Sequence, residues 1–95
     1  MNNQVIVTRH PALVSFLIEM GLADKSTPVI GHATPEAIKG KNVLGVLPLH
    51  LAVEAKSVTE VPMDIPPEMR GKELTIEQMR QYALTPRTYQ VFEQI

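Results

Sequence analysis

The alternation of short apolar runs with helical segments is the feature that most constrains the fold. Four runs of strand-forming residues occur, at 4–7, 27–31, 42–46 and 57–62. The segments between them have helical signals: Pro11 to Met20, a turn that begins at Thr34-Pro35, and a stretch from Leu47-Pro48 to about Lys56. Strands that alternate with helices favour a parallel sheet with right-handed crossovers. We therefore predict an α/β fold with a mainly parallel four-stranded sheet flanked by helices, the fourth strand being edge-like.

The first predicted helix carries two apolar strips. One strip has the i, i+3, i+4, i+7 spacing of a core-facing helix and consists of Leu13, Phe16, Leu17 and Met20. Val14 and Ile18 form the second strip. Pro11 at the start and Gly21 after the end are typical helix boundaries. We expect the first strip to cover the sheet, and the second either to contact a partner subunit or to be buried in the same chain.

The sequence changes character from about residue 63. Pro66-Pro67 predicts a loop, Thr75 to Gln78 match a capping box that begins a helix, and Pro86 ends or restarts a helix. Three of the four aromatic side chains follow the capping box, at Tyr82, Tyr89 and Phe92, so we expect this part to pack against the rest. We predict a single domain over residues 1–95, with a C-terminal loop and helical tail from about residue 63.

Charge and composition exclude several classes of partner. The chain has 9 Lys and Arg against 10 Asp and Glu, so it offers no general basic surface for duplex nucleic acid. It contains no cysteine, which excludes disulfides and thiolate metal sites. No apolar run reaches the roughly 18 residues of a membrane span, and no signal-peptide pattern follows Met1, so we expect a cytoplasmic protein. On folding, a domain this short buries only about 60 to 65 % of the surface that its unfolded chain exposes. A second subunit is therefore a reasonable way to complete the core.

All three histidines are predicted to lie just beyond the carboxyl end of a strand, where open parallel sheets bind ligands: they are His10, His32 and His50. Arg9 stands beside His10 at a turn from strand to helix. The free N–H groups and positive dipole end of the helix attract phosphate there, and a guanidinium matches phosphate geometry. Alternatively, the histidines are caps, His50 pairs with Glu54, and Arg9 belongs to a surface ion pair. We assign His32 a structural role.

Other chemistries have less support. The spacing of the histidines does not preorganise a zinc site, and no acidic cluster marks magnesium, so we predict no metal and no cofactor. The turn is similar to the strand-to-helix RHG of histidine phosphatases, but that family uses a considerably longer chain, and Pro11 replaces its glycine. No GxGxxG or GxxxxGK[ST] motif is present. Ser15 and Ser57 have no histidine at a spacing that indicates a serine nucleophile.

Three blocks, VTRHPALVSFL, GVLPLHLAVEA and DIPPEMRGKELTIEQM, resemble the CRISPR-associated family that we call Csx-sixteen. These are small single-domain proteins of type III CRISPR systems, related to ring nucleases that degrade cyclic oligoadenylates. The resemblance covers nearly the whole chain, and the blocks occur in the family's order. The matching positions are Thr8, Arg9, His10, Pro11, Leu47, Pro48, His50, Asp64, Pro66, Arg70, Gly71, Glu73 and Leu74.

The resemblance implies a Rossmann-like, CARF-like domain, a homodimer and a cyclic tetra-adenylate ligand across the dimer axis. It implies metal-independent cleavage by the substrate's own 2′-hydroxyl, with catalytic candidates Arg9, His10 and His50. At such a site we expect ligand contacts from Thr8, Pro11, Leu47, Pro48, Leu49 and Arg70. Two other functions stay open: a protein that sequesters the cyclic messenger without cutting it, and an accessory subunit of a CRISPR complex.

Overall fold

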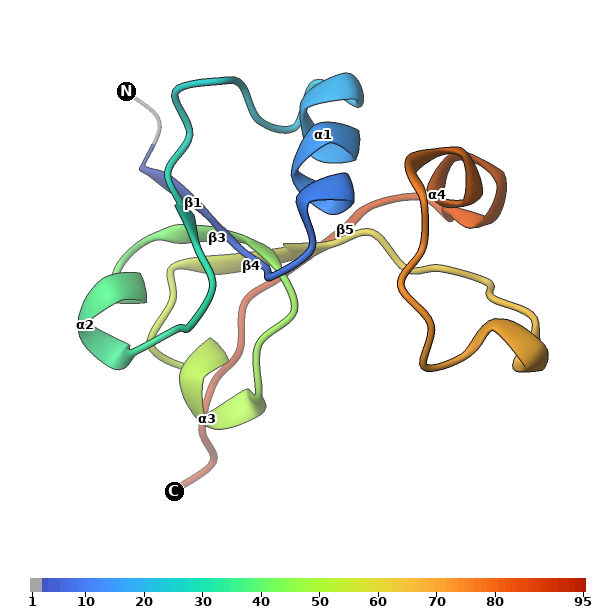
Figure 1. The fold of residues 1–95 in the computed structure, drawn as a ribbon. Coiled ribbons are helices and arrows are strands. Elements are labelled where there is room, and N and C mark those ends of the chain that lie inside the picture. Colours follow the sequence, from blue (N-terminus) through green and yellow to red (C-terminus); the bar gives the residue numbers. More distant parts are fainter. Residues whose placement is uncertain (1–2) are drawn as a thin grey trace.

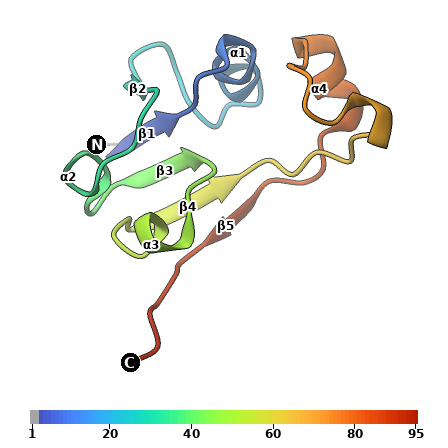
Figure 2. The same ribbon diagram turned by 60° about the horizontal axis from the view of Figure 1, so that its bottom comes forward.

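The computed structural model describes residues 3–95 and contains one five-stranded sheet in the order β2-β1-β3-β4-β5. The strands are β1 (Gln4–Val7), β2 (Val29–Ile30), β3 (Asn42–Gly45), β4 (Ser57–Glu60) and β5 (Arg87–Tyr89). The first four strands are parallel, and β5 pairs antiparallel with β4. Figure 2 shows β1, β3, β4 and β5 side by side. The α/β class and the mainly parallel sheet are confirmed.

Helices lie on both faces of the sheet. On one side is α1 (Pro11–Glu19), with α4 (Ile76–Tyr82) beside it, and on the other side are α2 (Pro35–Ile38) and α3 (Leu49–Ala52) (Figure 1). A short 3-10 helix, η1 (Pro67–Met69), lies in the connection between β4 and α4. The arrangement is compatible with a small Rossmann-like domain, because each parallel strand returns to the sheet through a helical crossover.

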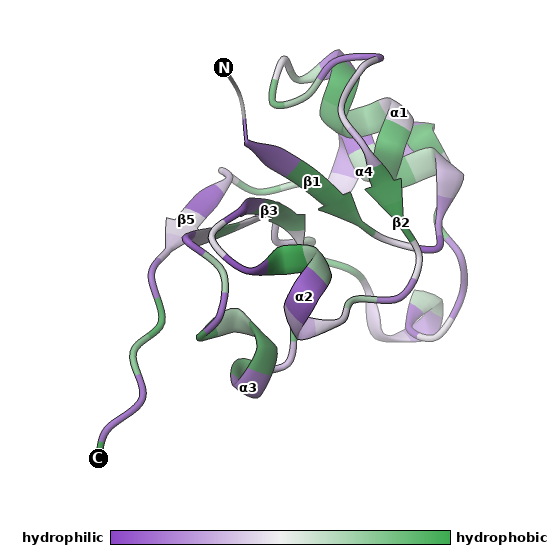
Figure 3. Cartoon of the chain, turned by 90° about the vertical axis from the view of Figure 1, so that its left-hand side faces the viewer, coloured by the Kyte–Doolittle hydropathy of each residue, from purple (hydrophilic) through white to green (hydrophobic). Residues whose placement is uncertain are grey.

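The strand β1 is central to the core because both of its faces are covered. Val5 packs in one cluster with Ile38 of α2, while Ile6 packs in a second cluster with Leu17 of α1. Successive side chains of a strand point to opposite faces, so a strand buried on both faces is apolar at nearly every position. Figure 3 shows this hydrophobicity along β1 and α1. The two-sided core fixes the end of β1 at Val7, where the turn into α1 begins.

The sheet has one strand more than the sequence patterns indicate. They place residues 57–62 at an edge, and this is wrong, since β4 lies between β3 and β5. The tail is helical only over α4. Pro86 cannot continue a helix without losing a backbone hydrogen bond, and the residues after it extend along β4. The hydroxyls of Thr59 and Thr88, which are paired across the two strands, lie 2.8 Å apart.

The sequence predicts where the helices start better than where they end. The first helix begins at Pro11 as expected, and the capping box of Thr75 and Gln78 begins α4. The expected helix over Leu47 to Lys56 is wrong in length, because only Leu49–Ala52 is helical. Backbone pairing explains the early end: the N–H of Lys56 donates to the carbonyl of Lys41 at 2.8 Å, which draws the chain out of the helix and into β4.

A two-point ion pair holds α4 against α1. The guanidinium of Arg80 donates from Nε to Oε2 of Glu19 at 2.7 Å and from Nη2 to Oε1 at 2.6 Å. These hydrogen bonds lower the pKa of Glu19 below its ordinary value. The helix α4 thereby lies against α1 within the same chain. The contact also brings residues 63–75 close to the start of α1.

Candidate functional site

The candidate site is built on the turn from β1 into α1. His10 is the N-cap residue of α1 and has an extended backbone, while Pro11 occupies the first helical position. The hydroxyl of Thr8 accepts a hydrogen bond from the backbone N–H of His10 at 3.1 Å. Pro11 has a fixed φ and restricts the backbone of the preceding residue to an extended conformation. The hydrogen bond to the Thr8 hydroxyl further orients the backbone of the turn. Thr8 and Pro11 therefore shape the backbone on which Arg9 and His10 are presented.

Arg9 extends from this turn across the end of the neighbouring strand. Its Nε donates to the carbonyl oxygen of Gly31 at 3.0 Å, and Gly31 directly follows β2. The residue is exposed. A guanidinium has five N–H donors, and this bond uses one of them, so its other donors stay available to an anion. The bond orients Arg9 toward the β2 side of the carboxyl edge.

His10 forms the most specific contact of the site. Its Nδ1 lies 2.9 Å from Oε1 of Glu73, and 55 % of the His10 side chain and 68 % of the Glu73 side chain are exposed. A carboxylate at Nδ1 favours a proton on that nitrogen, which makes Nε2 the nitrogen able to exchange a proton with a ligand. None of the hydrogen bonds described within residues 3–95 involves Nε2.

Glu73 is a candidate site residue to which the sequence analysis gives no role. It lies 63 positions from His10 along the chain, in the segment between η1 and α4. The RGKEL motif that carries part of the family resemblance contains it, and that motif was the available signal, although no role follows from it. The contact depends on the packing of α4 against α1, which spacing along the sequence cannot reveal.

Two hollows meet at His10. One is a groove of about 400 Å³ lined by Thr8, Arg9, His10, Pro11, Val14, Ser15 and Val29. The other, of about 190 Å³, is lined by His10, Ile65, Lys72, Glu73, Leu74 and Met79. We call the first the polar groove. It combines a cation, an imidazole and the N-terminus of a nine-residue helix, a setting in which an anion is stabilised.

The other two histidines lie apart from the polar groove. His32 is exposed, two residues after β2, and does not line this groove. His50 is exposed on α3, which lies on the opposite face of the sheet from α1 (Figure 1). The ion pairs described within residues 3–95 do not include His50 with Glu54. Within one chain, the structure therefore brings His10 together with Arg9 but does not bring His50 to them.

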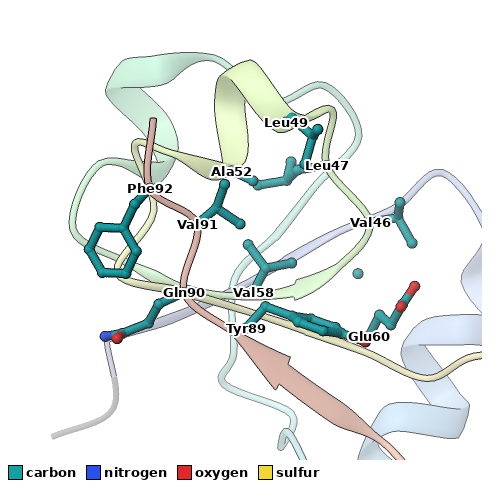
Figure 4. Close-up of a pocket in the computed structure, with 11 residues that line it drawn as sticks. Val46, Leu47, Leu49, Ala52, Val58, Glu60, Tyr89, Gln90, Val91 and Phe92 are labelled. Carbon is teal, nitrogen blue, oxygen red and sulfur yellow. The ribbon is translucent and has the colours of Figure 1, made fainter. Parts of the chain in front are cut away.

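The remaining predicted ligand contacts lie in other places. Leu47 and Leu49 line a second groove, between α3, β4 and the C-terminal segment (Figure 4). Pro48 is the N-cap residue of α3 and Arg70 follows η1, and both are exposed. The described residues contain no group of three or more His, Cys, Asp or Glu arranged to hold a metal ion. No helix within residues 3–95 is both long and apolar enough to cross a bilayer.

Comparison with known proteins identifies a family. The model of the family described as "Putative CRISPR-associated protein (Cas_VVA1548)" matches residues 5–92. No curated protein and no solved structure matches the chain. The family match spans β1 through the segment after β5, so it includes the polar groove and the second groove. The chain belongs to this CRISPR-associated family.

Proposed function

We propose that the chain is a metal-independent ring nuclease of the Csx-sixteen type. It binds cyclic tetra-adenylate as a homodimer and opens the ring to linear oligoadenylates that end in a 2′,3′-cyclic phosphate. The observation that carries the proposal is the placement of Arg9 and the His10–Glu73 pair together at the N-terminus of α1. The CRISPR association of the family supports a role in CRISPR signalling.

Arg9 and the start of α1 provide the phosphate-binding part of the mechanism. The ligand has four phosphates and approximate two-fold symmetry, so a symmetric dimer presents two copies of Arg9, one from each subunit, to one ring. Attack of a 2′-oxygen on the adjacent phosphorus builds negative charge on the phosphorane oxygens. A guanidinium and free helix N–H groups placed in advance stabilise that charge without rearrangement.

His10 provides proton transfer. The 2′-hydroxyl loses a proton as its oxygen bonds to phosphorus, and the departing 5′-oxygen gains one, so the products are a 2′,3′-cyclic phosphate and a 5′-hydroxyl. An imidazole can accept or donate a proton near neutral pH, so it suits either transfer. Glu73 holds Nδ1 of His10, and Nε2 faces the reacting oxygens. In this proposal His50 is the second candidate for proton transfer and Arg70 an additional cation for the phosphorane.

The test is to mix radiolabelled cyclic tetra-adenylate with the purified protein in EDTA and to separate bound, intact and linear species. The proposal predicts linear products with cyclic phosphate ends. Binding without products would contradict it and favour a sequestering protein, and neither binding nor cleavage would favour an accessory subunit. Lys25→Ala is the matched control for Arg9→Ala, since Lys25 is an exposed cation outside both grooves.

The dimer is a separate prediction. The helix α1 and the segment beyond Thr75 carry more apolar residues than one small sheet needs, and Leu84, Phe92 and Ile95 stay exposed in the single chain. Light scattering at micromolar concentration is expected to give twice the chain mass. A monomer that still cleaves the ring would show that a two-fold site is unnecessary.

A further inference from the structure

The second groove has the composition of a small-molecule site. Its volume is about 460 Å³, and its lining residues are Gly45, Val46, Leu47, Leu49, Ala52, Val58, Glu60, Tyr89, Gln90, Val91 and Phe92. Ligand pockets of roughly 300 to 1,000 Å³ with apolar walls and a few polar groups are typical of cofactor and substrate sites. We call it the apolar groove.

The register of the sheet explains how the walls of this groove form. Tyr89 is paired with Val58 across β4 and β5, so the two side chains stand on the same face, the one that carries α3. Glu60 lies two residues beyond Val58 and shares that face. Figure 4 shows Tyr89 and Glu60 on the side of the groove that faces Leu49 and Val46. An aromatic ring and a carboxylate thus border an otherwise largely apolar space.

The charge of the groove argues against phosphate and for a base with an amino group. Among its described lining residues only Glu60 is charged, and a carboxylate repels phosphate while accepting a hydrogen bond from an amino group. Arg87 is paired with Glu60 across the two strands, but the ion pairs described within residues 3–95 do not join them. The exocyclic amino group of adenine is such a donor, and the ring of Tyr89 offers a surface for stacking.

The apolar groove begins beside the polar groove. Gly45 lines the apolar groove and is paired with Val7 of β1. The residue after Val7 is Thr8, which lines the polar groove. Adjacent strands lie about 4.8 Å apart, a separation smaller than one nucleotide. Val46 and Leu49 are 71 % and 73 % exposed, so the entrance is open in the single chain. The entrance of the apolar groove and the polar groove therefore lie at neighbouring strands, β3 and β1.

We propose that the apolar groove is a nucleobase subsite that binds adenine. The base stacks on Tyr89, and its amino group donates a hydrogen bond to the carboxylate of Glu60. The proposal deepens the proposed function, on which it rests for the identity of the ligand. It also gives roles to two residues that have none in the sequence analysis: Glu60 selects the base and Tyr89 supplies stacking. Leu47 and Leu49, already expected to contact the ligand, form the opposite wall.

The test uses adenosine, which has no phosphate, and the full-length ¹⁵N-labelled protein. Titration to about millimolar nucleoside is expected to shift the amide signals of Val46, Glu60 and Tyr89, and to do so equally at low and high salt. Inosine, which replaces the amino group by a carbonyl, is expected to bind about tenfold or more weakly. Shifts confined to other residues, or no shifts at all, would overturn the proposal. No shifts are expected if a second copy of the chain fills the groove.

Three variants separate recognition from folding. In Glu60→Gln the amide can accept from adenosine or donate to inosine, so the preference for adenosine should fall to about twofold or less. Tyr89→Ala should weaken adenosine binding about tenfold, while Tyr89→Phe, which keeps the ring, should bind like the wild type. An unchanged preference in Glu60→Gln would contradict the proposal. If the protein cleaves the ring yet adenosine does not shift these residues, only the subsite fails; if adenosine binds here and the ring stays intact, only the nuclease fails.

Discussion

The polar and apolar grooves begin beside the paired residues Val7 of β1 and Gly45 of β3 and differ in the charged groups that line them. The polar groove has Arg9, His10 and a helix N-terminus, whereas the apolar groove has one carboxylate among aliphatic and aromatic side chains. The polar groove offers a cation to an anionic group, and the apolar groove offers an aromatic ring to a base. A nucleotide has both parts, so the contrast favours a nucleotide ligand over either fragment.

The largest effect is expected from Arg9→Ala on the affinity for cyclic tetra-adenylate. A charge-assisted hydrogen bond contributes about 1.5 to 3 kcal/mol, and a symmetric dimer loses two, so affinity should fall about a hundredfold or more. Titration with labelled ligand measures this. Adenosine affinity should be unchanged in the same variant, because the apolar groove is intact. Loss of both affinities would show that the two grooves are not independent.

His10→Ala should affect cleavage without comparable loss of binding. General acid–base catalysis typically contributes about a hundredfold to ten-thousandfold, so the single-turnover rate should fall by at least the lower figure while affinity changes only a few-fold. His50→Ala should have the smaller effect. If neither variant slows cleavage beyond about tenfold and Arg9→Ala abolishes it, the histidines are framework and in-line positioning of the 2′-hydroxyl carries the reaction.

Glu73→Gln tests the partner of His10. The amide keeps the size of the side chain but loses the negative charge that faces Nδ1. We expect a loss of cleavage rate of about tenfold, below that of His10→Ala, with ring affinity unchanged. Glu73→Asp should restore part of the rate. Glu68→Gln is the control, since Glu68 is exposed on η1 and lies outside the described contacts of His10.

Gly45→Ala tests the junction of the two grooves. Gly45 has φ +133°, and a Cβ there would collide with the carbonyl oxygen of Val7. Side chains are strained in this backbone region by about 1 to 3 kcal/mol, so unfolding in urea should shift to lower concentration by a corresponding amount. An unchanged unfolding midpoint would mean that β1 and β3 do not need this close approach. Gly71→Ala is the comparison for the collision, because no atom lies near a Cβ added at that position.

The smallest effect concerns the contact that carries Glu73 toward the site. The pKa of Glu19 is lowered by the hydrogen bond from Arg80, so the pair stabilises the fold above the ordinary carboxylate value of 4.5 and loses that contribution as pH falls through the lowered value. Arg80→Met should slightly reduce thermal stability near pH 7 and leave it close to that of the wild type at the acid end. An equal reduction at both pH values would point to packing instead of charge.

Local patterns predict the first strands and the start of α1, whereas in the C-terminal part they predict only the start of α4. Strand β1 and the start of α1 follow from β-branched residues before a Pro11-containing turn, since such signals act within a few residues. Strand β5 has only three residues, and its pairing with β4 is a long-range contact. The partnership of His10 with Glu73 also depends on distant packing. Arg9 and His10 could therefore be found from the sequence, whereas Glu73, Glu60 and Tyr89 acquire roles only in three dimensions.

The most direct measurement compares the ribose ring with its all-2′-deoxy counterpart under single-turnover conditions in EDTA. If the 2′-hydroxyl is the nucleophile and the two grooves hold phosphate and base, both rings should bind with similar affinity, because neither groove requires that hydroxyl. Only the ribose ring should open, and mass spectrometry should find a 2′,3′-cyclic phosphate at the new end. Opening of the deoxy ring at a similar rate, or a ribose ring that is bound but stays intact, would contradict the account.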